Sequence, residues 1–81
     1  MFNRDKMPPE VVPGSVFECR HRLYNSVEVA EVLDVRDDCS GIPHVRFQHS
    51  YRYSNREDEQ GVRVLALTAF ARRFHPVEAA A

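Results

Sequence analysis

Between Val45 and Tyr53 the side chains alternate in character with a period of two, and this feature constrains the fold most. The odd positions carry apolar or aromatic residues and one histidine, whereas arginine, glutamine and serine occupy the even positions. Successive side chains of a β-strand point to opposite faces, so the pattern predicts a strand with one buried face. Such a strand is stable only beside other strands or a helix that cover its apolar side.

Three further segments are predicted to be strands. Residues 15–24 alternate in the same way, and residues 62–67 form a short valine-rich run. The segment 27–37 is rich in β-branched residues, which favours a strand over a helix. Its alternation slips at Val32 and Leu33, and the slip predicts a β-bulge or a strong bend.

Loops are expected where the strand patterns end. Residues 37–41 predict a hairpin loop in which Gly41 adopts a positive φ. Residues 55–61 are polar and mostly charged, and they predict a solvated acidic loop between the third and fourth strands.

The segment 69–74 predicts a short helix with Thr68 as its N-cap. Phe70 and Phe74 are four positions apart, so they share a helix face and are expected to pack across one end of the core. The helix should stop there, because Pro76 disfavours a helical conformation in the residue before it.

The chain has 81 residues, enough for one domain. We expect a folded domain over residues 13–76, between flexible tails at 1–12 and 77–81. Hydrophobic residues make up 43% and charged residues 28%, an ordinary balance for a globular fold. A core this small leaves no room for a large substrate cleft, so we expect a protein that is not an enzyme.

The order of these features carries a resemblance to a known fold. Gly14, then the segment 30–32, Gly41, the segment 45–47, a valine-rich strand and a helical turn follow one another as in the SH3-like barrels, which include Tudor and KOW-type modules. The resemblance implies a mainly β fold: a small antiparallel barrel of four to five strands with one short C-terminal helix.

The same resemblance implies something about binding. In Tudor-like barrels, aromatic side chains at the mouth enclose a methylated cation or stack on a base, which points to Tyr51 and Tyr53, with Tyr24 beside them. The chain departs from other members of the group, because it has no Trp and only three glycines. Recognition of proline-rich peptides is therefore not expected.

Cys19, His21, Cys39 and His44 are residue types that could together hold zinc in a tetrahedral site. Their spacing differs from the tight paired turns of zinc ribbons and fingers, and a free cysteine is most often a small core residue. A thiol nucleophile at Cys39 has no activating motif around it. We therefore expect no metal, no cofactor and no catalytic residue.

Charge bears on the class of partner. Eleven basic and twelve acidic residues give a net charge of −1, whereas dedicated nucleic-acid binders usually show a basic excess. Arginines at 46 and 52 share the polar side of the third strand, and those at 20 and 22 share the polar side of the first. With Arg63 expected beside them on the fourth strand, a surface of five arginines could hold phosphates. Pairing with nearby acidic residues is the simpler expectation.

We accordingly expect a binding or adaptor module that docks another protein, with a nucleic-acid module that uses the arginine-lined sheet face as the alternative. The sequence leaves the partner and the oligomeric state open. The residues expected to line the binding surface are Arg46, Tyr51, Arg52, Tyr53 and Arg63.

The start of the chain lacks the apolar run of a signal peptide, and no segment approaches the roughly 20 apolar residues that span a bilayer. We expect a cytoplasmic protein without membrane contact. Its cysteines should then be reduced thiols.

Overall fold

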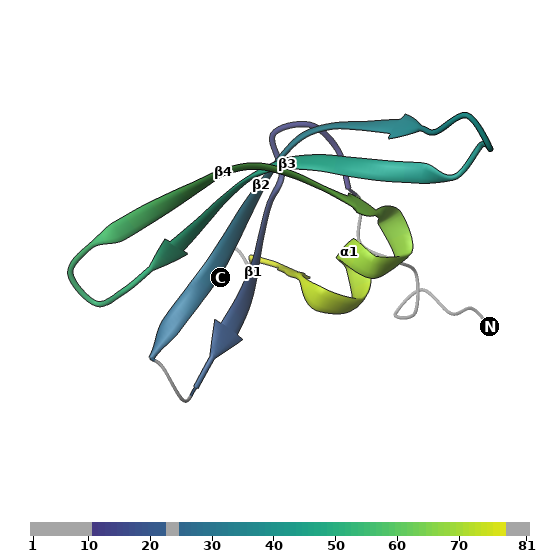
Figure 1. The fold of residues 1–81 in the computed structure, drawn as a ribbon. Coiled ribbons are helices and arrows are strands. Elements are labelled where there is room, and N and C mark those ends of the chain that lie inside the picture. Colours follow the sequence, from purple (N-terminus) through teal and green to yellow (C-terminus); the bar gives the residue numbers. More distant parts are fainter. Residues whose placement is uncertain (1–10, 23–24, 78–81) are drawn as a thin grey trace, which may run out of the picture.

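The computed structural model describes residues 11–22 and 25–77. It contains one antiparallel five-stranded sheet in the order β4-β3-β2-β1-β5, which confirms the mainly β prediction. The sheet curves around a short helix on its concave side, and within the described residues it is open, with β4 and β5 at its edges (Figure 1). The elements are β1 (Val16–His21), β2 (Ser26–Asp37), β3 (Pro43–Arg52), β4 (Glu57–Ala66), α1 (Leu67–Arg73) and β5 (His75–Pro76).

The odd-numbered residues of β3 face the concave side, as the alternation predicts. Val45 and Phe47 are 0% and 2% exposed and form the middle of the core. Strand pairing extends this layer sideways, because Ala30 and Val32 lie opposite His49 and Phe47. The core consists of Phe17, Ala30, Val32, Val45, Phe47, Phe70 and Phe74.

The predicted bulge in the second strand is confirmed. Val32 pairs with Phe47, but the next pair is Asp34 with Arg46, so Leu33 is an extra residue in β2. After the bulge the odd-numbered residues of β2 face the core in place of the even-numbered ones. Val35 accordingly pairs with Val45 and packs against the core. Bulges bend the strand that carries them, which helps the sheet to curl around α1.

A second bulge lies in β4, where Gln60 is the extra residue between the pairs His49–Gly61 and Ser50–Glu59. Gly61 has a φ of 95°, a conformation that side chains with a Cβ rarely adopt. The predicted acidic loop over 55–61 is therefore wrong, because β4 begins at Glu57. Its first residues are polar on both faces since an edge strand can expose both to water, and this removes the alternation from the sequence.

The helix lies where it was predicted, but it begins differently. Its N-cap is Ala66, which makes no side-chain capping bond, so the prediction of Thr68 as the cap is wrong. Phe70 and Phe74 are buried as expected, with ring centroids 5.0 Å apart. The amide of Phe74 donates to the carbonyl of Phe70 at 2.9 Å, and the chain then extends into β5.

The ends of the chain add two observations. Val11, which falls in the predicted flexible tail, packs against the core, and Val77 bonds the carbonyl of Val16 through its amide. Residues 1–10, Tyr24 and residues 78–81 lie outside the described residues. Within the described part of the chain, no helix has the length and apolar character needed to cross a membrane.

Candidate functional site

One end of the concave face is polar and aromatic. The register places Cys19, Glu28 and Tyr51 in one row across β1, β2 and β3, next to the core row that ends at His49. We call this region the polar end. Its members are Cys19, His21, Ser26, Glu28, His49, Tyr51, Tyr53 and Arg73.

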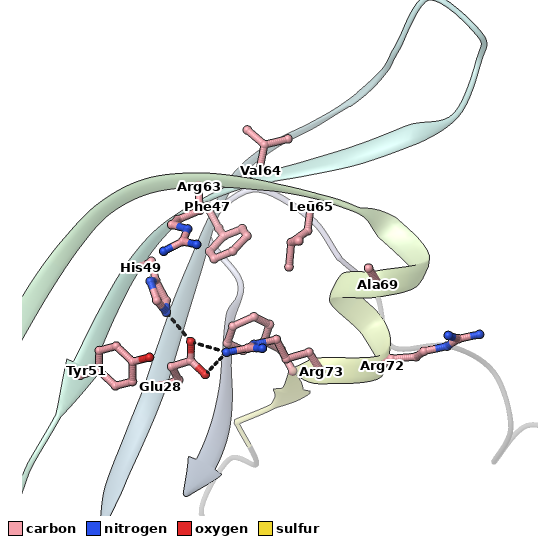
Figure 2. A pocket seen from close by; sticks show the side chains of 11 residues that line it. Glu28, Phe47, His49, Tyr51, Arg63, Val64, Leu65, Ala69, Arg72 and Arg73 are labelled. Atoms are coloured by element: carbon pink, nitrogen blue, oxygen red, sulfur yellow. Dashed lines mark hydrogen bonds and ion pairs between the residues drawn. The ribbon is translucent and has the colours of Figure 1, made fainter.

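Glu28 is the centre of the polar end and is only 2% exposed. His21 donates through Nε2 to Oε1 at 2.9 Å, and His49 donates through Nε2 to Oε2 at 2.6 Å. Nη2 of Arg73 lies 2.7 Å from Oε1 and 2.8 Å from Oε2. Figure 2 shows Arg73 reaching from α1 to the carboxylate while Arg72 points away.

These contacts fix the charge of Glu28. Burial alone would raise its pKa, but the hydrogen bonds from Arg73, His21 and His49 together lower the pKa from 4.5 to about 2. A carboxylate has about four acceptor sites, and two donors on each oxygen fill them. At neutral pH Glu28 is therefore a fixed negative charge and a poor proton acceptor, so it is unsuited to general-base catalysis.

Beside this network lies the aromatic shelf, formed by His21, Ser26, Tyr51 and Tyr53, which line a cleft of about 430 Å³. The rings of Tyr51 and Tyr53 are nearly parallel, with centroids 6.5 Å apart and an interplanar angle of 23°. Both side chains are half-buried, so their ring faces are partly available to a ligand. The guanidinium of Arg56 lies 4.8 Å from the centroid of Tyr53.

A groove of about 440 Å³ runs between α1 and strands β3 and β4 (Figure 2). Phe47, Leu65 and Phe74 form its apolar part, and Arg63 lies near His49 at its other side. Arg63 makes no ion pair within 4.0 Å with any residue that the structure describes.

The five residues predicted to bind are divided between two faces of the sheet. Tyr51 and Tyr53 lie together on the aromatic shelf. Arg46 and Arg52 alternate with the concave residues of β3 and so face the convex side, where Arg46 bonds Asp34 at 2.9 Å. Arg63 pairs with Phe47 in the register and lines the groove, so the prediction that it extends a row with Arg46 is wrong.

The four possible zinc ligands are also divided. Cys19 and His21 lie at the polar end with Glu28. Cys39 and His44 belong to the β2–β3 hairpin, where Cys39 is exposed and the ring of His44 bonds the carbonyl of Ile42 at 3.0 Å. The four residues therefore do not form one cluster.

Sequence reasoning missed Glu28 and Arg73. A signal for Glu28 was present, because it shares parity with Ala30 and Val32 and so had to lie on the buried side of its strand. No local pattern could indicate Arg73, which meets Glu28 only because α1 folds back under the sheet.

The polar end holds a balanced charge network and offers aromatic faces, the ring of His21 and one thiol to solvent or to a ligand. These groups suit the binding of cations, of other polar ligands or of a protein segment. Comparisons of this chain with protein-family models, with curated proteins and with solved structures found no match.

Proposed function

We propose that this protein is a small, non-enzymatic binding module of the SH3-like type that docks a protein partner. Four strands in sequential order, a helical turn and a fifth strand paired with β1 resemble the SH3-like barrels in their succession. Function is carried by sites and not by folds, so the case for docking depends on the aromatic shelf.

The observation that carries the proposal is the pair of half-buried tyrosine rings beside the acidic side chain of Asp58. The guanidinium of Arg56 over Tyr53 is a cation–π contact made within the chain, and it supports the attraction of a cationic group to this surface. Asp58 lies opposite Tyr51 in the register, so it shares the face of the sheet that carries the shelf. We infer that the shelf takes a lysine or arginine side chain from a basic segment of the partner.

Other function classes receive less support. A general-base role does not suit Glu28, whose acceptor sites are filled. A nucleic-acid module would need its arginines on one surface, but Arg46 is paired with Asp34 on the convex side and Arg63 lies in the concave groove. Protein docking at the shelf is the reading we favour.

The test is an amide NMR titration with three probes: a lysine- and arginine-rich peptide, an acidic peptide of equal length and a mixed single-stranded oligonucleotide. We expect the basic peptide to shift the amides of Tyr51 and Tyr53. Replacement Tyr51→Ala should weaken its binding about tenfold, equivalent to about 1.4 kcal/mol.

Arg46→Ala is the matched control, since Arg46 lies on the opposite face and should leave peptide binding unchanged. Basic-peptide shifts that avoid the shelf, or that persist fully in Tyr51→Ala, would contradict the proposal. Salt-sensitive oligonucleotide binding that weakens in Arg46→Ala would instead support the nucleic-acid alternative.

A further inference from the structure

Three ligand-type atoms converge near the C-terminal end of β1. The Sγ atom of Cys19, a ring nitrogen of His21 and a carboxylate oxygen of Glu28 all lie within 4.8 Å of one another. The fold produces this convergence, because Cys19 and Glu28 are cross-strand partners and His21 follows on the same face of β1. From this geometry we propose that Cys19, His21 and Glu28 bind a zinc ion.

The three ligand atoms must move to reach tetrahedral separations. Zinc takes nitrogen and oxygen ligands at about 2.0–2.2 Å and sulfur at about 2.3 Å, so two ligand atoms at tetrahedral corners lie about 3.3–3.7 Å apart. His21 Nε2 and Glu28 Oε1 are 2.9 Å apart, and they need to separate by only a few tenths of an ångström. The pairs that include Sγ of Cys19 lie within 4.8 Å, so they have to close by at most about 1 Å.

The donor set selects the metal. A thiolate, an imidazole and a carboxylate together favour zinc over magnesium or calcium, which prefer oxygen ligands. Three protein ligands leave one tetrahedral position for water or for a donor from another molecule. His49 would remain bonded to Oε2 of Glu28 and orient the carboxylate, as outer partners do in zinc sites.

Arg73 is the competitor. Its guanidinium contacts both oxygens of Glu28, so its positive charge weakens the attraction between the carboxylate and a metal ion. Zinc would take the Oε1 lone pair that now accepts from His21. Arg73 therefore lowers the affinity for zinc, and its removal should raise it.

Zinc binding requires the loss of a proton from Cys19 and a route for the ion from solvent. Binding would release the thiol proton of Cys19 to water and leave the neutral ring of His21 with its proton on Nδ1. β5 pairs only with Phe17 and Glu18, so the edge of β1 beyond Glu18 has no strand beside it among the described residues. The side chain of His21 is 32% exposed, which gives an ion a path from solvent.

The first experiment uses the full chain with reduced thiols, titrated with Zn²⁺ by calorimetry and with Co²⁺ as a coloured substitute. We expect one ion per chain and a thiolate-to-cobalt charge-transfer band. Cys19→Ser and His21→Gln should each weaken binding at least tenfold. The same substitutions in the hairpin, Cys39→Ser and His44→Gln, are matched controls that should leave binding unchanged, and Arg73→Gln should tighten it.

The second experiment needs no variant and so does not depend on how Cys19→Ser folds. Iodoacetamide labelling followed by mass spectrometry should show that Zn²⁺ slows alkylation of Cys19 but not of Cys39. Equal protection of both thiols, no protection, or equal loss of binding in the control variants would overturn the proposal. The zinc site shares His21 with the aromatic shelf, and Tyr53→Ala distinguishes the two proposals, since it leaves all three zinc ligands in place and should keep full zinc binding.

Discussion

The Nη2 atom of Arg73 lies 2.7 Å and 2.8 Å from the two carboxylate oxygens of Glu28, although the two residues are 45 positions apart. The contact ties α1 to the middle of the sheet at the edge of the core. Because Glu28 is almost fully buried, the stability of its charge depends on Arg73 and on two histidines.

Acid should destabilise the fold through Glu28. Its pKa in the folded state is about 2 against 4.5 for the free group, so the stabilisation is complete above pH 4.5 and disappears as the pH falls towards 2. The difference corresponds to about 3 kcal/mol of unfolding free energy. Urea unfolding measured across this pH range should show the loss, and Glu28→Gln should remove this component. An unchanged pH profile in Glu28→Gln would assign the acid sensitivity to other carboxylates.

Phe74→Ala should cost about 3–5 kcal/mol, because it empties a fully buried position that contacts other aromatic rings. This approaches the whole stability of a small domain. Thermal unfolding followed by circular dichroism is the measurement. Thr68→Ala, at an exposed helix position that makes no cap, is the control and should change stability by less than about 0.5 kcal/mol.

Gly61→Ala should destabilise the protein by about 1–2 kcal/mol through the backbone alone. Gly61 has a φ of 95°, and an added Cβ would meet no atom within 4 Å, so no clash contributes. Urea midpoints of this variant and of Val62→Ala, a neighbouring exposed side chain, can be compared directly. A loss no larger than that of Val62→Ala would show that the bulge relaxes without cost.

The Arg46–Asp34 and Arg73–Glu28 pairs should contribute differently to the stability of the fold. Arg46→Ala breaks a pair on the solvent-exposed side of the sheet and should leave the urea midpoint almost unchanged. Arg73→Ala leaves the buried carboxylate of Glu28 without its cation, so it should raise the pKa of Glu28 and lower the midpoint. Equal effects of the two substitutions would contradict this ranking.

The periodicity of apolar side chains along the sequence predicted those parts of the fold that depend on neighbouring residues. The facing of β3, the bulge at Leu33 and the burial of Phe70 and Phe74 all follow from periodicity. The start of β4 was missed because an edge strand can be polar on both faces.

The candidate site was harder to predict because it depends on contacts between distant segments. Tyr51 and Tyr53 were predicted to lie together, and they do. The facing of Arg63 depends on the register of β4 against β3, which the sequence does not specify on a strand whose sides are both polar or mixed. Arg73 meets Glu28 only through the tertiary path of α1.

The bulge at Leu33 also has a consequence for changes in chain length. Deleting Leu33 would leave Asp34 opposite Arg46 and Val35 opposite Val45, so every later residue of β2 would keep its side. Deleting Glu31 instead would turn Val32 outwards, opposite Gln48, and place Leu33 opposite Phe47 in the core row. The strand can therefore shorten by one residue at Leu33 and keep its inner and outer surfaces, and what it would lose is the bend that wraps it around Phe70.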